Sequence, residues 1–178
     1  EAGSRWGNAL KLLTVYGLRP VELTHLHVRK TPKGDKYLWC SYEKRSGGGI
    51  TKPRRLEPLP IENTDWKLLA LLDAKLIELP KLSAEGNGVA EQIRKYLERR
   101  KAWTSLKERV KARNEELGTY SFRHSYSVRG HKLGIDSGSM SSAMGHSLEV
   151  HSREYPWSTN ETTQTAFDRA RKIYSSSA

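Results

Sequence analysis

The chain has 178 residues, of which 36% are apolar, and its 31 Lys and Arg against 20 Asp and Glu give a formal charge of +11. This length allows one folded domain with a core of its own, and the basic balance favours a polyanionic partner, nucleic acid before a membrane surface. The lone Cys40 excludes an internal disulfide, and the sequence has neither an apolar run of roughly 20 residues nor a signal-peptide pattern, so we expect a cytoplasmic protein.

The first predicted element is a helix, because four apolar residues recur at helical spacing: Trp6, Leu10, Leu13 and Tyr16. Gly17 follows where a helix end favours a left-handed residue. Pro20 can open a second short helix, since its missing N–H would be unpaired there anyway. We therefore expect Arg19 at a tight corner between two helices. Because the chain opens directly on a helical pattern, we also expect it to be a C-terminal piece of a longer protein.

A basic β-hairpin is predicted next. Residues 37–43 are rich in aromatic side chains, and residues 50–60 follow after the glycines at 47–49. Pro53 and Pro58 restrict the second strand to edge pairing. The glycines indicate a mobile tip between the two strands.

Helices are predicted for most of the remaining chain. Residues 63–79 have a nearly continuous apolar face, with Asn63 as a possible cap, and predict a core helix. Residues 83–117 are charged but carry apolar residues at helical intervals, which predicts a solvated helix or helix pair. The periodic positions there are Val89, Ile93, Leu97, Leu106 and Val110.

Three shorter helices are predicted further on. Residues 119–134 begin at the cap candidate Thr119 and end at Gly134, with Arg123 in the first turn. A second helix covers residues 137–144 and stops at Gly145, and a third covers residues 147–155 and stops at Pro156.

A last helix is expected over residues 160–174, where one stripe is formed by Ala166, Phe167, Ala170 and Tyr174. The predicted fold class is therefore mainly α with a small antiparallel sheet, in one domain that covers residues 1–178.

No metal or cofactor is expected from the motifs. The sequence has no clustered carboxylates, no Cys/His zinc spacing, no Walker-type glycine loop and no Gly-x-Ser-x-Gly element. It does have arginines at structurally fixed positions and tyrosines close to histidines. A guanidinium binds phosphate bidentately and stays charged at any usable pH, so a phosphodiester is the reaction centre that these residues suit.

A tyrosine nucleophile would need help at such a centre. Its reference pKa of about 10 makes deprotonation cost roughly 4 kcal/mol at pH 7. Nearby guanidinium charges favour the phenolate and also bind the oxygens of the attacked phosphate.

Several motifs occur in one order along the chain: GLRPVEL, a basic hairpin with lysines, YSFRH, MGH, and a tyrosine nine residues beyond that histidine. From Gly17 to Tyr155 this order resembles the catalytic domain of the tyrosine recombinases, the phage integrase family. The resemblance implies a site-specific recombinase that cleaves and rejoins DNA through a covalent 3′-phosphotyrosine, in excision or integration of a mobile element. The tyrosine at position 120 resembles, within this family, the recombinases that excise elements interrupting cyanobacterial nitrogen-fixation genes.

The resemblance implies roles for individual residues. Arg19 of GLRPVE and Arg123 of YSFRH match the two catalytic arginines, and Glu22 matches an orienting carboxylate. His146 of MGH matches a hydrogen-bond donor to the phosphate, and Tyr155 matches the nucleophile.

The lysine that protonates the leaving 5′ oxygen has two candidates on the hairpin. Lys44 ends the first half, and Lys52 begins the second half. Lys44 is favoured because related proteins keep this lysine on the outgoing side, and Lys52 is the alternative.

The sequence departs from the family's His-x-x-Arg pattern at Tyr120. A phenol can form a hydrogen bond at the phosphate but is a much poorer proton acceptor than imidazole near neutral pH. The nearby His124 and His131 are interpreted as structural or DNA-facing residues.

A second histidine competes with His146 for a role beside the nucleophile. On a helix over residues 147–155, Leu148, His151 and Tyr155 share one face, so local geometry pairs His151 with the tyrosine. The resemblance assigns the role to His146 instead.

The family resemblance also implies partners. Its members act as homotetramers on two double-stranded DNA sites and carry a separate N-terminal clamp domain, which we expect to be absent from this chain. A nucleoid-associated location would follow from binding DNA. The 160–174 helix is expected to pack in cis or on a neighbouring protomer and to bury Phe167. The alternative function is a basic DNA-binding module, or a degenerate recombinase that binds its sites without cutting.

Overall fold

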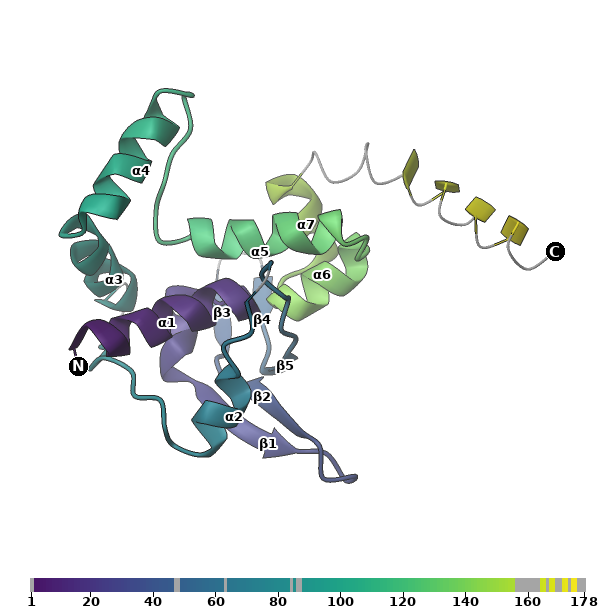
Figure 1. Ribbon diagram of the computed structural model, residues 1–178. Coiled ribbons are helices and arrows are strands. Elements are labelled where there is room, and N and C mark those ends of the chain that lie inside the picture. The colour runs from purple at the N-terminus through teal and green to yellow at the C-terminus, as the bar shows by residue number, and fades with distance from the viewer. Residues whose placement is uncertain are drawn as a thin grey trace.

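The computed structural model (Figure 1) describes residues 2–46, 49–62, 64–83, 85, 88–155, 164–165, 167–168, 171–172 and 174–175. In chain order its elements are α1 (Ala2–Tyr16), the 3-10 helix η1 (Pro20–Thr24), β1 (Leu26–Lys30), β2 (Lys36–Cys40), β3 (Lys44–Ser46), β4 (Gly49–Thr51), β5 (Arg54–Leu56), α2 (Leu68–Asp73), α3 (Gly88–Glu98), α4 (Lys101–Lys111), α5 (Ser121–Lys132), α6 (Ser137–Met144) and α7 (Leu148–Glu154). The predicted class, mainly α with a small antiparallel sheet, is confirmed.

The main sheet has three antiparallel strands in the order β1-β2-β5. Val28, Leu38 and Leu56 lie opposite one another across it. Pairing of β2 with β5 confirms the predicted hairpin, while β1 was not predicted. Strands β3 and β4 form a separate two-stranded ribbon between β2 and β5, in which Lys44 lies opposite Thr51.

The larger core cluster lies between α1, the sheet and α3. Its fully buried members include Leu12 and Leu13 of α1, Leu38 and Cys40 of β2, and Ile93 of α3. Burial raises the pKa of the Cys40 thiol to about 11. Helix α1 ends as predicted at Gly17, whose φ of +60° is a backbone conformation that glycine adopts without steric cost.

A second core cluster joins α5, α6 and α7. It contains Leu59, Tyr126, Met140, Met144 and Tyr155. Helices α6 and α7 agree with the predicted boundaries, because local caps define them. Asp136 accepts a hydrogen bond from the Ser139 backbone N–H, and Ser147 accepts one from the backbone N–H of Val150.

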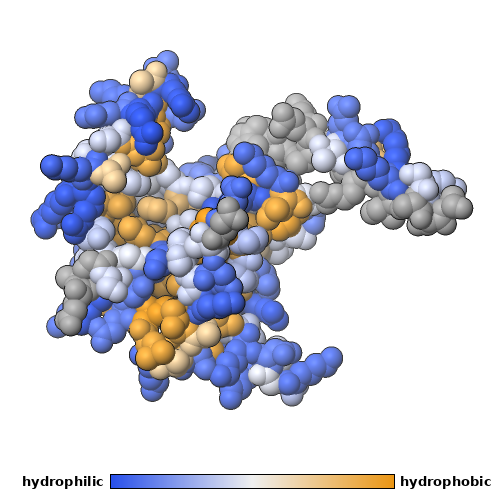
Figure 2. Space-filling model, viewed as in Figure 1, coloured by the Kyte–Doolittle hydropathy of each residue, from blue (hydrophilic) through white to orange (hydrophobic). Residues whose placement is uncertain are grey.

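The helix predicted over residues 63–79 is much shorter than expected. Helix α2 covers only Leu68–Asp73, and the backbone has positive φ at Lys67 (50°) and Lys75 (56°), which interrupts the helix on both sides. Asn63 lies outside the described residues. Figure 2 shows a hydrophobic surface patch over α2.

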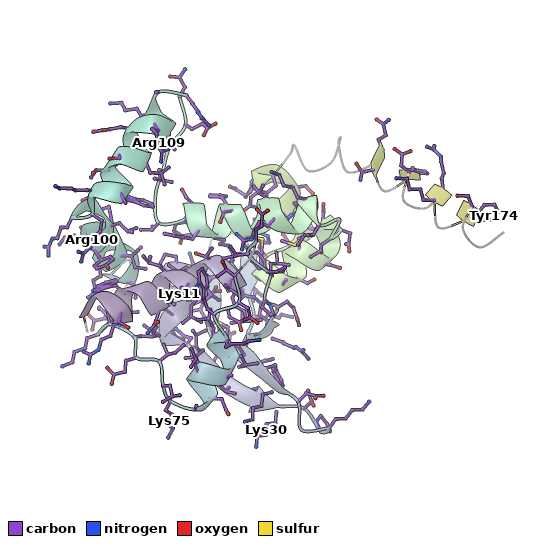
Figure 3. All side chains as sticks on the ribbon, viewed as in Figure 1. Lys11, Lys30, Lys75, Arg100, Arg109 and Tyr174 are labelled. Carbon is purple, nitrogen blue, oxygen red and sulfur yellow. The ribbon has the colours of Figure 1, made fainter. Side chains whose placement is uncertain are left out.

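The charged segment forms the predicted helix pair, α3 and α4. Helix α3 buries Val89, Ile93 and Leu97, whereas α4 has no buried residue. Basic side chains such as Arg100 and Arg109 extend from this pair into solvent (Figure 3).

The described residues from 164 to 175 are helical and lie away from the sheet (Figure 1). Phe167 is 61% exposed and Tyr174 is 81% exposed. The other two residues of the predicted stripe, Ala166 and Ala170, lie outside the described residues. Within this chain Phe167 is therefore not buried.

In the described part of the chain, none of the helices combines the length and the apolar character that crossing a membrane requires.

Candidate active site

The centre of the site is the buried carboxylate of Glu22, which is 0% exposed. Its Oε1 accepts hydrogen bonds from Arg19 Nη1 at 2.8 Å and from Arg54 Nη1 at 2.9 Å, and its Oε2 accepts one from Arg54 Nη2 at 3.1 Å. Arg123 Nη1 lies 3.9 Å from Oε2. We call Arg19, Arg54 and Arg123 the arginine cluster.

Local structure explains how each arginine reaches this carboxylate. Arg19 is the residue before η1, and its backbone N–H donates to Glu22 Oε2 at 2.8 Å, which fixes the corner that Pro20 opens. On β5 the burial alternates, so Arg54 and Leu56 face inward while Arg55 faces solvent. Arg123 lies in the first turn of α5 and is 5% exposed.

The C-terminal end of α6 provides further acceptors for the arginine cluster. Arg54 Nε donates to the Ala143 carbonyl at 2.8 Å, and Arg19 Nη2 donates to the Gly145 carbonyl at 3.0 Å. Arg123 donates to the Met144 carbonyl. Carbonyl groups at a helix C-terminus lack partners in the helix and carry partial negative charge. Helix α6 therefore holds three guanidinium groups from distant parts of the chain together.

Gly145 makes this close approach possible. Its φ is +68°, and a Cβ atom built there would lie 2.7 Å from Arg54 Nη1. A side chain at this position would strain the backbone and collide with the guanidinium.

The electrostatics of the site favour an anion. Burial alone would raise the pKa of Glu22, but the charge and hydrogen bonds of Arg54, with Arg123 and Arg19, lower it to about 2. Burial and the charge of Arg19 lower the pKa of Arg123 to about 9, which still leaves it charged at neutral pH. Three positive charges and one negative charge leave a net charge of +2, and such a site can bind a phosphate diester.

Three histidines form a hydrogen-bonded chain beside the arginine cluster. His146 Nε2 lies 2.9 Å from His151 Nδ1, and His151 Nε2 lies 2.9 Å from His131 Nε2. Burial and the charge of Arg123 lower the pKa of His146 to about 3, and burial and His131 lower that of His151 to about 4. Burial also lowers the pKa of His131. All three are therefore neutral at pH 7. We call them the histidine chain.

Tyr155 ends α7 and is only 3% exposed. Its ring centroid lies 4.8 Å from that of His151 and 5.5 Å from that of His124. Burial raises the pKa of Tyr155, and the charge of Arg123 opposes this rise only in part. The structure thus brings together Arg19, Glu22, Arg123, His146, His151 and Tyr155. Pro156 lies outside the described residues.

The two candidate lysines lie on the β3–β4 ribbon. Lys44 begins β3, and Lys52 follows β4 directly. Both side chains are exposed. Thr51, which lies opposite Lys44 and directly precedes Lys52, is buried. Exposure leaves either ammonium group accessible to a bound polyanion.

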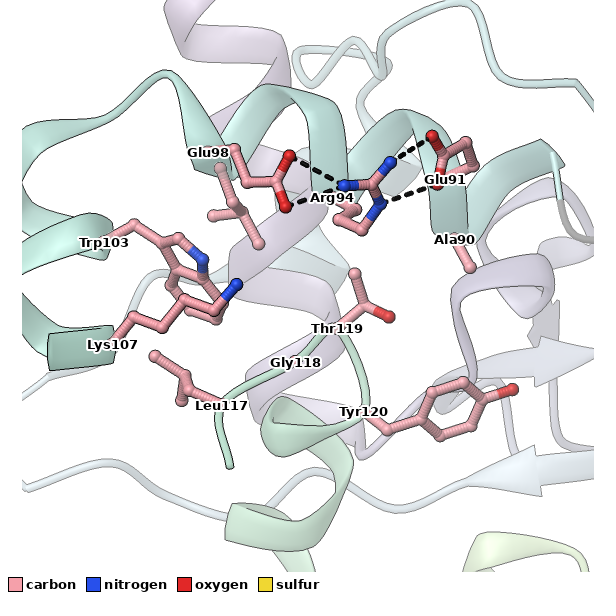
Figure 4. A pocket seen from close by; sticks show the side chains of 11 residues that line it. Ala90, Glu91, Arg94, Glu98, Trp103, Lys107, Leu117, Gly118, Thr119 and Tyr120 are labelled. Atoms are coloured by element: carbon pink, nitrogen blue, oxygen red, sulfur yellow. Dashed lines mark hydrogen bonds and ion pairs between the residues drawn. The ribbon is translucent and has the colours of Figure 1, made fainter. Parts of the chain in front are cut away.

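Tyr120 lies in a different setting, at the pocket of about 390 Å³ between α3, α4 and the start of α5 (Figure 4). It is 49% exposed. Arg94 occupies one wall of this pocket, held between Glu91 and Glu98 by hydrogen bonds of 2.5 to 2.8 Å.

Two members of the site were missed by the motif order. The motif order places Arg54 only within a basic hairpin, although the alternation of a short strand with Leu56 facing inward would place Arg54 beside the core. The sequence predicts a structural or DNA-facing role for His131, and in the structure its ring on α5 contacts that of His151 on α7. Such a contact, between residues 20 positions apart, leaves no local pattern in the sequence.

Comparison with known proteins gives no match to any family model, curated protein or solved structure.

Proposed function

We propose that this chain is the catalytic part of a site-specific DNA recombinase, which cleaves and rejoins DNA through a covalent phosphotyrosine. The observation that supports this most is the convergence of the arginine cluster on Glu22, next to the histidine chain and Tyr155. These groups come from η1, β5, α5, α7 and the turn between α6 and α7. Together they offer the donors that a phosphodiester needs and a phenol that can attack it.

The arginine cluster would bind the scissile phosphate. Arg19 is the most open of the three, with 17% of its side chain exposed, while Arg54 and Arg123 lie behind it. Guanidinium groups stabilise the charge that builds up on the phosphoryl oxygens as the phenol attacks. Glu22 would act as the orienting carboxylate.

Tyr155 would be the nucleophile. Its oxygen would attack phosphorus, the bond to the 5′ oxygen would break, and the DNA 3′ end would become linked to the enzyme. The reverse reaction rejoins the strands, and the bond energy is conserved in the phosphotyrosine. Because Tyr155 is buried here, DNA binding must expose the phenol before it can react.

Protonation of the leaving 5′ oxygen is assigned to Lys44, with Lys52 as the alternative. A 5′-bridging sulfur in place of that oxygen leaves readily without a proton, because a thiol is much more acidic than an alcohol. The lysine whose replacement by Ala slows cleavage of the oxygen substrate, but not of the sulfur substrate, is the acid.

The test of the proposal uses a pool of nicked duplexes of randomised sequence, in which a cleaved strand end diffuses away and traps the adduct. The wild-type protein should give a covalent protein–DNA band on a denaturing gel, and Tyr155→Phe should give none. Tyr126→Phe is the matched control, because it removes another buried phenol whose hydroxyl donates to the Glu57 carbonyl. An adduct that survives in Tyr155→Phe would contradict the proposal.

A DNA-binding module that does not cut is the second candidate. It is favoured by the burial of Tyr155, which raises the pKa of the phenol. Salt-sensitive binding of the same duplexes without any covalent band would select this function. For the recombinase we propose, in addition, assembly as a homotetramer on two DNA sites.

A further inference from the structure

The three hydrogen-bonded rings of the histidine chain must all donate in the same direction along the chain. Both ring nitrogens of His151 are engaged, Nδ1 with His146 Nε2 and Nε2 with His131 Nε2, each at 2.9 Å. A neutral imidazole carries one proton and one lone pair. The histidine chain therefore has two possible tautomer arrangements. In one, each N–H donates toward His131, and in the other, each N–H donates toward His146.

The His131 end selects one of them. The backbone of Ile135 forms a hydrogen bond with the His131 imidazole that raises its pKa, which only an acceptor does. The Ile135 N–H already donates to the Gly130 carbonyl at 3.0 Å, so the acceptor is the Ile135 carbonyl. His131 Nε2 faces His151, which leaves Nδ1 to donate to that carbonyl.

The remaining protons follow from this assignment. With its proton on Nδ1, His131 accepts at Nε2 from His151 Nε2–H. His151 then accepts at Nδ1 from His146 Nε2–H. His146 is left with a lone pair on Nδ1, and it is a proton acceptor, not the donor that the family resemblance implies.

We propose that His131 and His151 are positioning residues that hold His146 in this tautomer, and that His146 Nδ1 is the proton acceptor of the cleavage reaction. This inference rests on the proposed function. His146 would thereby provide the proton acceptor at the site, because the phenol of Tyr120 is a poor one. As Tyr155 attacks phosphorus, the phenol proton passes to His146 Nδ1, and the 5′ oxygen leaves with a proton from the hairpin lysine.

Bound DNA would make His146 more basic. The groups that lower its pKa besides burial are Arg123, His151, Arg19 and Arg54. A phosphodiester anion on the arginine cluster offsets these positive charges, so His146 gains basicity when the substrate is in place.

The tautomers can be measured on the protein alone. Nitrogen-15 chemical shifts of the histidine rings at pH 7 report which nitrogen carries the proton, and single His variants assign the six rings. We expect the proton of His146 on Nε2, that of His151 on Nε2 and that of His131 on Nδ1. A proton on His146 Nδ1 would overturn the inference whether or not the protein cuts DNA.

The functional test compares two variants at one position. His131→Gln keeps an acceptor for His151 Nε2–H, whereas His131→Phe fills similar space without one. Covalent adduct formation on the nicked duplex pool should fall about tenfold or more in His131→Phe, with unchanged DNA binding, and should be largely retained in His131→Gln. A purely structural role would make the polar Gln at least as harmful as Phe in this buried position.

His124→Gln is the matched control, because His124 also touches Tyr155 but lies outside the histidine chain. Equal adduct rates in wild type and His131→Phe would reject the positioning role of His131 while leaving the recombinase proposal standing. Absence of any adduct from the wild-type protein would reject both, even with the expected tautomers.

Discussion

At the scale of single residues, the charge of Glu22 is expected to contribute strongly to the free energy of unfolding. It is a buried carboxylate held charged by three guanidinium groups, and it also accepts the Arg19 backbone N–H. Removing one partner of a buried ion pair leaves the others uncompensated, which costs about 3–5 kcal/mol. We expect Glu22→Gln to lower the free energy of unfolding by this amount in urea denaturation at pH 7. Glu57→Gln, at an exposed pair with Arg55, should change it by about 1 kcal/mol at most.

The pH dependence of the same variant gives a second prediction. The pKa of Glu22 is lowered from 4.5 to about 2 on folding, so the unfolded state binds more protons between these values. The stability due to the charged carboxylate is therefore complete above pH 4.5 and is lost as pH falls toward 2. The difference in unfolding free energy between wild type and Glu22→Gln should shrink over that window. A difference that stays constant down to pH 2 would contradict the assigned pKa.

Gly145 provides a test of packing against the arginine cluster. Gly145→Ala combines a positive φ with a Cβ 2.7 Å from Arg54 Nη1, so we expect a loss of about 1–3 kcal/mol in thermal or urea unfolding. Gly7→Ala, inside α1 with no atom within 4 Å of the added Cβ, should instead gain about 0.5–1 kcal/mol. Equal effects at both glycines would show that the contact with Arg54 does not constrain Gly145.

At the scale of elements, α3 and α4 differ in how they are held. Ile93 of α3 is 0% exposed in the main core, whereas α4 buries no residue. We expect Ile93→Ala to cost about 2–5 kcal/mol, because it leaves a cavity. Leu106→Ala, on the half-buried face of α4, should cost less than half as much. Urea denaturation of both variants measures the two values, and equal costs would argue against the different burial of the two helices.

The sequence predicts correctly those helices whose ends are marked by capping residues or by a glycine in the left-handed conformation. Asp136, Gly145 and Ser147 mark α6 and α7 through caps and a left-handed turn, and these helices agree with the prediction. The helix predicted over residues 63–79 is wrong in extent. Its continuous apolar face gave no sign of where the helix would stop, because the positive φ at Lys67 and Lys75 left no composition signal, and within α2 only Leu68 is buried.

The candidate site was predictable to a similar degree. Motif order identified residues that the fold does bring together around Glu22 and His151. It did not identify Arg54, because alternation with Leu56 in a strand of only three residues is a weak signal on its own. It also could not order the protons of the histidine chain, since that order depends on the backbone carbonyl of Ile135.

At the scale of the whole molecule, the charge of +11 determines how DNA binding should respond to salt. Each neutralised phosphate releases counterions, so the affinity falls linearly on a log–log plot against salt concentration. We expect Arg109→Gln, in the basic α4, to reduce the slope by about 1. Lys75→Gln, beyond α2, should leave it unchanged. Fluorescence anisotropy with duplex DNA measures both slopes, and identical slopes for all three proteins would exclude α4 from the interface.

The burial of Cys40 allows opening of the sheet to be followed by chemical labelling of its thiol. The thiol is the only one in the sequence, is 0% exposed, and sits on β2 directly opposite Arg54 on β5. A thiol reagent in solution can react with Cys40 only when the sheet opens, so the labelling rate measures how often the strand pair that carries Arg54 opens. Duplex DNA that engages Arg54 should slow this labelling, and it would do so whether or not the bound strand is cut.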